Sequence, residues 1–210
     1  MRIAIFGATG KVGTRLVDQA LQVGHEVTAV VRNASRLTAS RYGEPEVVTA
    51  DVMDPASIAP GLTGSDAVIS AIGPVRKGPT TVLADSARSI IDAMETVGVK
   101  RLLTVSGSMV DDTGDGALLK YVGKPLARHF LRDVCADMRR AEVEIHSSHL
   151  DWTIFRPPNL ADGPATGRYR TALDRNLPRG FRVRRADLAS EMLRSIDDFE
   201  TIRRHVFIAS

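Results

Sequence analysis

Short apolar runs alternate along the chain with longer segments of helical periodicity. The first apolar run, residues 2–6, ends at a glycine, and residues 11–23 then place apolar side chains at helical spacing. Gly24 is typical of a helix end, and a β-branched run follows it at residues 25–31. This order predicts a strand, a tight turn, a helix and a second strand.

The same alternation continues to the end of the sequence. Apolar runs that are not interrupted by polar residues are typical of parallel strands buried on both faces. We therefore predict an α/β fold with a doubly wound parallel sheet of the Rossmann type, in a single domain over residues 1–210. Expected strands are 46–50, 67–71, 101–105, 152–155 and 205–208, expected helices are 81–97 and 187–196, and residues 162–179 are expected to form a substrate-side loop within an acceptor-side segment at about 157–185.

Composition and charge indicate a soluble globular protein. Apolar residues make up 43% of the chain, charged residues 25%, and the formal net charge is +3. That charge is too small to indicate a nucleic-acid partner, and no apolar run approaches the roughly 20 residues that span a bilayer. With a single cysteine, Cys135, and no leader-like segment before the first strand, we expect a cytoplasmic monomer or homodimer without nucleic-acid or membrane partners.

A glycine-rich turn lies between the first strand and the first helix. Gly7 permits a sharp exit from the strand, Gly10 lets a pyrophosphate approach the backbone, and Gly13 lets the helix pack close to the sheet. The alternative is a plain strand-to-helix turn without a ligand. The context predicts a dinucleotide site made by Gly7, Thr9, Gly10, Lys11, Val12 and Gly13.

The end of the second strand predicts which dinucleotide binds. An NAD site places a carboxylate there for the ribose 2′-hydroxyl, whereas this chain has Arg32 and Arg36. Guanidinium groups bind phosphate through paired hydrogen bonds, so we predict NADP, with NADPH preferred over NADH. The alternative is two solvated surface arginines.

Two further strand ends are predicted to contact the cofactor. Asp51 and Val52 would contact the adenine edge, although an N-cap is the alternative role, for which Asp54 before Pro55 fits better. Small residues after the fourth strand would leave room for the ribose. These are Ala71, Ile72 and Gly73.

Several segments together resemble the atypical short-chain dehydrogenases/reductases, specifically the NAD(P)H-binding flavin reductase and biliverdin-IXβ reductase group, which is close to the NmrA-like proteins. The resemblance implies hydride transfer from the nicotinamide to a flavin, a biliverdin-like tetrapyrrole or a quinone, with the backbone of Pro157, Pro158 and Asn159 covering the nicotinamide. The segments are residues 7–13, 31–37, 51–52, 79–82, 87–90, 148–158, 166–169, 182 and 187–189.

The chain departs from the usual short-chain dehydrogenase pattern at its proton donor. Tyr121 is followed by Lys124 rather than by a lysine four positions later, which makes ordinary ketone substrates less favourable. Flavin reduction tolerates this loss because solvent supplies the proton. Ser106 and Ser108 follow the fifth strand and are the candidate catalytic hydroxyls, with ordinary turn serines as the alternative.

Two remaining features give weaker predictions. His146 and His149 lack a third ligand at suitable spacing, so no metal is predicted. The arginine-rich stretch 168–185 either holds the phosphate or propionates of an acceptor or is solvated. The leading hypothesis is an NADPH-dependent reductase of a small conjugated acceptor, and the alternative is a non-catalytic NmrA-like NADP(H)-binding redox sensor. A nucleotide-sugar epimerase would need the Tyr-Lys pair and a larger C-terminal part.

Overall fold

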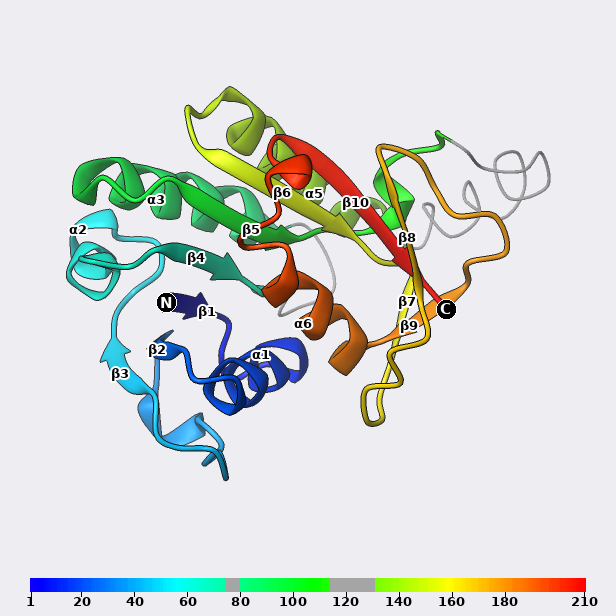
Figure 1. Ribbon diagram of the computed structural model, residues 1–210. Helices are drawn as coiled ribbons and strands as arrows, with labels where there is room; N and C mark the ends of the chain where they lie inside the picture. Colours follow the sequence, from blue (N-terminus) through cyan, green and yellow to red (C-terminus); the bar gives the residue numbers. More distant parts are fainter. Residues whose placement is uncertain (75–79, 114–130) are drawn as a thin grey trace.

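The computed structural model describes residues 1–74, 80–113 and 131–210 (Figure 1). Within these residues, eight strands form one sheet in the order β3-β2-β1-β4-β5-β6-β10-β8. All neighbouring pairs are parallel except β10 and β8. The strands are β1 (Arg2–Phe6), β2 (Glu26–Val31), β3 (Glu46–Thr49), β4 (Ala67–Ser70), β5 (Arg101–Val105), β6 (Asp151–Arg156), β8 (Arg170–Leu173) and β10 (Arg204–Ala209).

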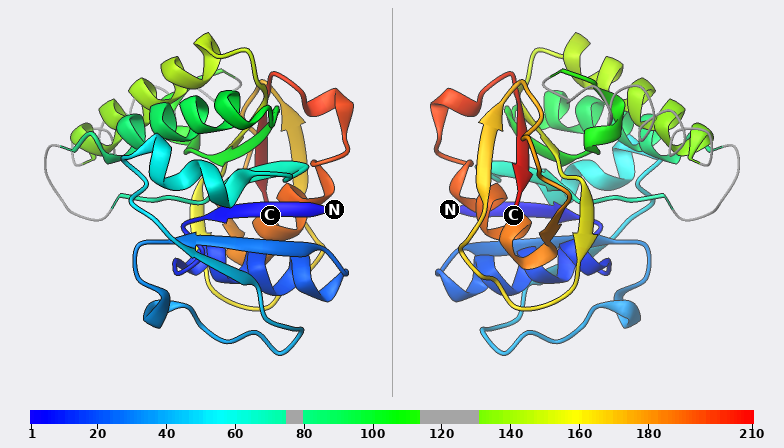
Figure 2. Two further views of the ribbon diagram at one scale, coloured as in Figure 1. Left: turned by 90° about the vertical axis from the view of Figure 1, so that its left-hand side faces the viewer. Right: turned by 90° about the vertical axis from the view of Figure 1, so that its right-hand side faces the viewer.

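Helices cover both faces of this sheet, so its central strands are buried on both sides (Figure 2). In β1, Ile3 and Ile5 belong to one core cluster, while Ala4 and Phe6 belong to the other. The first cluster lies against α1 (Lys11–Gln22) and α6 (Arg185–Arg194), and the second lies against α2 (Pro55–Ile58), α3 (Val82–Val97) and α5 (Arg132–Ser147). The predicted α/β doubly wound class is therefore confirmed.

The chain direction makes one edge of the sheet the place for a ligand. The strand order reverses between β1 and β4, whose residues pair from Ile3–Ala67 to Phe6–Ser70. In open α/β sheets, ligands bind outside the carboxyl ends of the strands at this reversal point. The segments that follow β1, β2, β3, β4, β5 and β6 all begin at this edge, and they contain the residues predicted to contact the cofactor.

The structure corrects the prediction that residues 162–179 form a substrate-side loop without strands. Strand β8 lies within that range and pairs antiparallel with β10 at the edge of the main sheet. On either side of β8 in the sequence, β7 (Asn159–Ala161) and β9 (Arg182–Arg184) form a separate two-stranded sheet. These strands are only three or four residues long, so backbone pairing specifies them and periodicity does not reveal them. The acceptor-side segment is thus held by strand pairing.

Short 3₁₀ segments complete the description of the backbone. They are η1 (Ala34–Arg36), η2 (Ala59–Leu62), η3 (Ser108–Val110) and η5 (Phe199–Thr201). In the described part of the chain, no helix has the length and apolar character needed to cross a membrane.

Candidate functional site

The glycine turn at the start of α1 is packed too closely for side chains. Gly7 has a φ of +71°, and its carbonyl oxygen accepts a 2.8 Å hydrogen bond from the Gly10 amide. A Cβ at Gly13 would lie 2.0 Å from the Gly7 oxygen, and one at Gly7 would lie 2.6 Å from the oxygen of Ala71. Gly10 is the N-cap of α1 and offers no side-chain hydrogen bond to the first helical amides. The geometry fits a dinucleotide pyrophosphate, since these amides are left to bind an anion.

The two arginines predicted to select NADPH lie at the carboxyl end of β2. Arg32 follows the strand directly, and Arg36 ends η1, which begins when Asn33 accepts a 3.0 Å hydrogen bond from the Ser35 amide. Both arginines are exposed, and neither forms an ion pair with any residue that the structure describes. Their guanidinium groups are therefore available to a ligand, and the NADPH preference stays a prediction.

The end of β3 separates the roles of the two aspartates there. Asp54 is the N-cap of α2, and its Oδ1 accepts a 3.0 Å hydrogen bond from the Ala56 amide. Asp51 is exposed at the strand end, and its Oδ1 accepts a 3.0 Å hydrogen bond from the Met53 amide. The prediction that Asp54 is the better cap is confirmed. The structure leaves Asp51 and its half-buried neighbour Val52 at the sheet edge, where adenine contact was predicted.

After β4, the chain leaves the sheet beside the glycine turn. Ala71 donates its amide to the oxygen of Phe6 at 3.0 Å, and the Ala71 carbonyl faces Gly7. Ala71 and Ile72 are half-buried, while Gly73 is exposed, with open space where a Cβ would lie. This segment is therefore in contact with the turn predicted to hold the pyrophosphate.

The two candidate serines after β5 differ in their surroundings. Ser106 is 8% exposed, and its Oγ has no hydrogen-bond partner among the described residues. It lines a cavity of about 30 Å³ that Ser70 and Thr104 also line. Ser108 begins η3, and its amide donates a 2.9 Å hydrogen bond to the oxygen of Pro157. Since an unpaired buried hydroxyl is costly, Ser106 is the stronger candidate for a ligand contact.

The backbone after β6 is fixed by these contacts and by β7. Besides the bond from Ser108 to Pro157, the Asn159 amide and its Nδ2 both donate to the oxygen of Phe181, at 3.3 Å and 3.1 Å. Pro158 lies between them and is half-buried. The Asn159 side chain is therefore committed to the pairing of β7 with the segment before β9.

A buried cluster of charged side chains lies at the carboxyl end of β6 and was not predicted from the sequence. Arg156 is 5% exposed and binds Glu142 through two hydrogen bonds, of 2.6 Å and 3.2 Å. Its third contact is the Asp111 carboxylate, at 2.7 Å. Burial opposes ionisation of Asp111, but hydrogen bonds from Thr113 and the charge of Arg156 outweigh it and lower the pKa of that carboxyl. The only sequence signal was an arginine ending an apolar strand.

The acceptor-side segment is joined directly to the glycine turn. Asp162, which follows β7, accepts hydrogen bonds from Lys11 Nζ at 3.1 Å and from Arg185 Nη1 at 2.7 Å. The hydrogen bond from Lys11, together with the charge of Arg185, lowers the pKa of the Asp162 carboxyl. The fully buried Asp187 in α6 accepts hydrogen bonds from the amides of Thr166 and Gly167, at 2.6 Å and 2.9 Å. Side chains thus anchor both ends of residues 162–167.

His146 pairs with a histidine that is distant in sequence, and not with His149. The Nε2 of His146 lies 3.0 Å from the Nε2 of His205, and the His146 ring lies 4.8 Å from the Trp152 ring at a tilt of 47°. His149 is exposed and does not belong to this group. Burial lowers the pKa of both His146 and His205. Among the residues that the structure describes, no group of three or more metal-ligating side chains occurs. Tyr121 and Lys124 lie outside the described residues.

Comparisons with known proteins agree with this geometry. The profile of the NAD(P)H-binding family matches residues 7–199. The Bacillus subtilis protein named "Uncharacterized sugar epimerase YhfK" is 30% identical over 215 residues, which cover 97% of this chain and 92% of that protein. A solved structure from Burkholderia pseudomallei is 33% identical with a TM-score of 0.84, and each chain covers 100% of the other.

A further solved structure carries a named activity. ChuY from Escherichia coli O157:H7, described as an anaerobillin reductase, is 27% identical with a TM-score of 0.78, over 100% of this chain and 97% of that one. The family match spans most of the chain and begins at the first glycine of the turn. The chain therefore belongs to the NAD(P)H-binding family, which uses a nicotinamide cofactor.

Proposed function

We propose that this protein is an NADPH-dependent reductase that transfers hydride to a flavin or a related conjugated acceptor. The observation that carries the proposal is the contact between Lys11 of the glycine turn and Asp162 of the acceptor-side segment, at 3.1 Å. Because of this contact, an acceptor held by β7, β9 and their loops would lie beside the cofactor. Family membership and the named activity of ChuY support the same class of reaction.

The cofactor is proposed to lie along the carboxyl edge of the sheet. The amides of Thr9, Lys11, Val12 and Gly13 would bind its pyrophosphate, and Arg32 and Arg36 would bind the 2′-phosphate. Bound there, NADPH supplies the hydride. The unpaired Ser106 hydroxyl would donate to the nicotinamide amide or to the acceptor ring, which would satisfy the group that the protein alone leaves without a partner.

The acceptor class follows from how the proton is supplied. Reduction of a conjugated ring or methine system needs correct positioning of two flat molecules, and solvent can deliver the proton. The spacing of Tyr121 and Lys124 departs from the pair that ketone reduction and sugar epimerisation require. That spacing also favours the alternative function, an NmrA-like sensor that binds NADP(H) without turnover.

Stopped-flow mixing of protein, NADPH and acceptor tests the proposal. We expect NADPH oxidation above the rate in free solution with FMN, biliverdin or a quinone, and a weaker response with NADH. Ser106→Ala should lower kcat/KM by about 5-fold, since one hydrogen bond contributes about 1 kcal/mol. Ser195→Ala is the matched control, because Ser195 Oγ is also buried and unpaired but lies at the end of α6. Tight NADPH binding without oxidation of any acceptor would favour the sensor.

A further inference from the structure

A cavity lined by arginines lies on the acceptor side of the protein. Its volume is about 250 Å³, and it lies between the loop after β7 and strand β9. The polar side chains that line it come from these two segments and from the residue that follows β10. They are Asp162, Thr166, Arg168, Arg182, Arg184 and Ser210.

Arginines outnumber acidic side chains in the lining of this cavity, with three arginines and one aspartate. Arg168, Arg182 and Arg184 form no ion pair with any of them. The acidic side chain of Asp162 is already engaged by Lys11 at 3.1 Å and by Arg185 at 2.7 Å. Three arginines therefore line one cavity without an ion-pair partner among the described residues, an arrangement that suits an anionic ligand.

The cavity is held in shape before any ligand binds. Arg184 Nη1 donates a 3.0 Å hydrogen bond to the oxygen of Pro164, and Gly163, with a φ of +130°, would place a Cβ 3.3 Å from the same nitrogen. On the other side, buried Asp187 holds the amide and hydroxyl of Thr166 at 2.6 Å and 2.8 Å. Preorganised donors lose less conformational entropy when a ligand binds.

We propose that this cavity is the subsite for the anionic groups of the acceptor, either a phosphate or carboxylates. This inference rests on the proposed function, because it assigns the acceptor of that reductase to the anionic members of its class. The position fits, since Asp162 lines the cavity and also contacts Lys11 in the glycine turn. The cofactor phosphates have their own candidates in the turn amides and in Arg32 and Arg36, which belong to other elements.

The test uses pairs of acceptors that differ only in the anionic group. FMN is compared with riboflavin, and biliverdin with its dimethyl ester, by fluorescence quenching or absorbance in saturating NADP⁺, so that no turnover is needed. We expect the anionic member of at least one pair to bind about 10-fold more tightly or better, as charge-assisted hydrogen bonds allow. The pair that shows the preference identifies phosphate or carboxylate as the ligand group.

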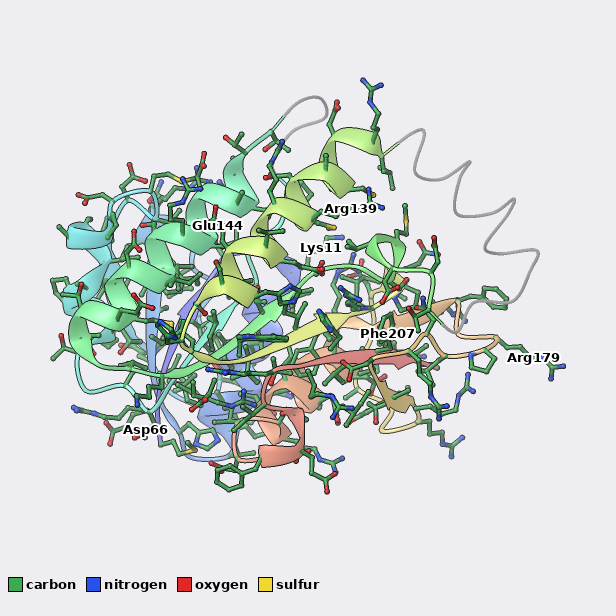
Figure 3. The ribbon with its side chains drawn as sticks, turned by 90° about the horizontal axis from the view of Figure 1, so that it is seen from above. Lys11, Asp66, Arg139, Glu144, Arg179 and Phe207 are labelled. Carbon is green, nitrogen blue, oxygen red and sulfur yellow. The ribbon has the colours of Figure 1, made fainter. Side chains whose placement is uncertain are left out.

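Two double variants assign that preference to the cavity. Arg168→Ala with Arg182→Ala should reduce it to about 2-fold or less, because both guanidinium groups are removed. Arg175→Ala with Arg179→Ala is the matched control, since it removes the same charge from exposed residues that do not line the cavity. Figure 3 shows Arg179 pointing away from the body of the protein. The control should keep the preference of the unmodified chain.

Inorganic phosphate provides a readout without substitution, because it should displace the preferred anionic acceptor and leave the neutral member bound. The inference is overturned if neither pair shows a preference, if the Arg168/Arg182 variant keeps it, or if the control loses it equally. Failure of the reductase proposal has a different signature. In that case NADPH is not oxidised, although the anionic acceptor still binds more tightly and loses this advantage in the Arg168/Arg182 variant.

Discussion

Gly13→Ala is the substitution that tests the glycine turn most directly. The added Cβ would lie 2.0 Å from the Gly7 oxygen and 2.6 Å from its carbonyl carbon, and both atoms belong to backbone that no rotamer change can move. Ordinary contact begins at 3.4 Å, so helix and turn must separate by about 1.4 Å. Overpacking of this kind costs about 1–3 kcal/mol, partly offset by the higher helix propensity of alanine, about 1 kcal/mol.

The substitution should weaken cofactor binding as well as lower stability. The amides of Lys11, Val12 and Gly13 move with the first turn of α1, and a displacement of about 1 Å can weaken a positioned interaction by about 100-fold. We expect the Kd for NADPH to rise at least 10-fold, measured by fluorescence titration, while the free energy of unfolding in urea falls by about 2 kcal/mol at most.

Gly24→Ala is the control for a purely structural loss. Gly24 lies beyond the other end of α1, has a φ of +85°, and has open space where its Cβ would lie. An alanine forced into this left-handed conformation costs about 1–2 kcal/mol without moving the glycine turn. The Gly24→Ala variant should therefore be less stable than the unmodified chain and bind NADPH with the same affinity. If Gly13→Ala binds NADPH as tightly as the unmodified chain, the turn does not hold the pyrophosphate.

Three further predictions address other parts of the molecule. Arg32→Ala and Arg36→Ala should each raise the Kd for NADPH by about 10-fold and leave the Kd for NADH unchanged. If the Kd rises equally for both cofactors, these arginines do not bind the 2′-phosphate. Asp187→Asn should lower the free energy of unfolding by about 1–3 kcal/mol and speed amide exchange at residues 166 and 167, because a neutral amide replaces the charged acceptor and its NH2 group cannot accept from the Thr166 hydroxyl. Burial lowers the pKa of His146 and His205 in the folded chain. Below about pH 6.5 the unfolded chain therefore binds protons that the folded chain does not, and the free energy of unfolding in urea should fall from pH 7.5 to 5.5. The His205→Gln variant should show a smaller fall.

The sequence predicts the half of the site that depends on local pattern. Residues 2–6 are continuously apolar and end at Gly7, so strand, turn and helix could be placed from neighbouring residues alone. The same logic located Ser106 directly after β5, because parallel strands buried on both faces end at polar residues near one edge. In each case the position along the chain determines the position in the fold.

The other half depends on contacts between residues far apart in sequence. Lys11 and Asp162 are separated by 151 positions, and Arg156 and Asp111 by 45. The periodicity of the sequence does not indicate such pairings. An arginine-rich stretch also looks the same in the sequence whether its side chains are solvated or line a cavity. Strand β8 was missed for a related reason, since an edge strand of four residues is specified by its partner β10.

The two anchors of the acceptor-side segment differ in strength, and this difference bears on how the site would respond to a ligand. Asp187 is fully buried and its hydrogen bonds to Thr166 and Gly167 are shielded from water, so that end of the segment is fixed to α6. Asp162 is 65% exposed, and such ion pairs contribute about 0.2–1 kcal/mol and weaken with salt. A ligand phosphate beside Lys11 can therefore replace Asp162 as its partner at small cost, while Asp187 keeps the arginine-lined cavity in place.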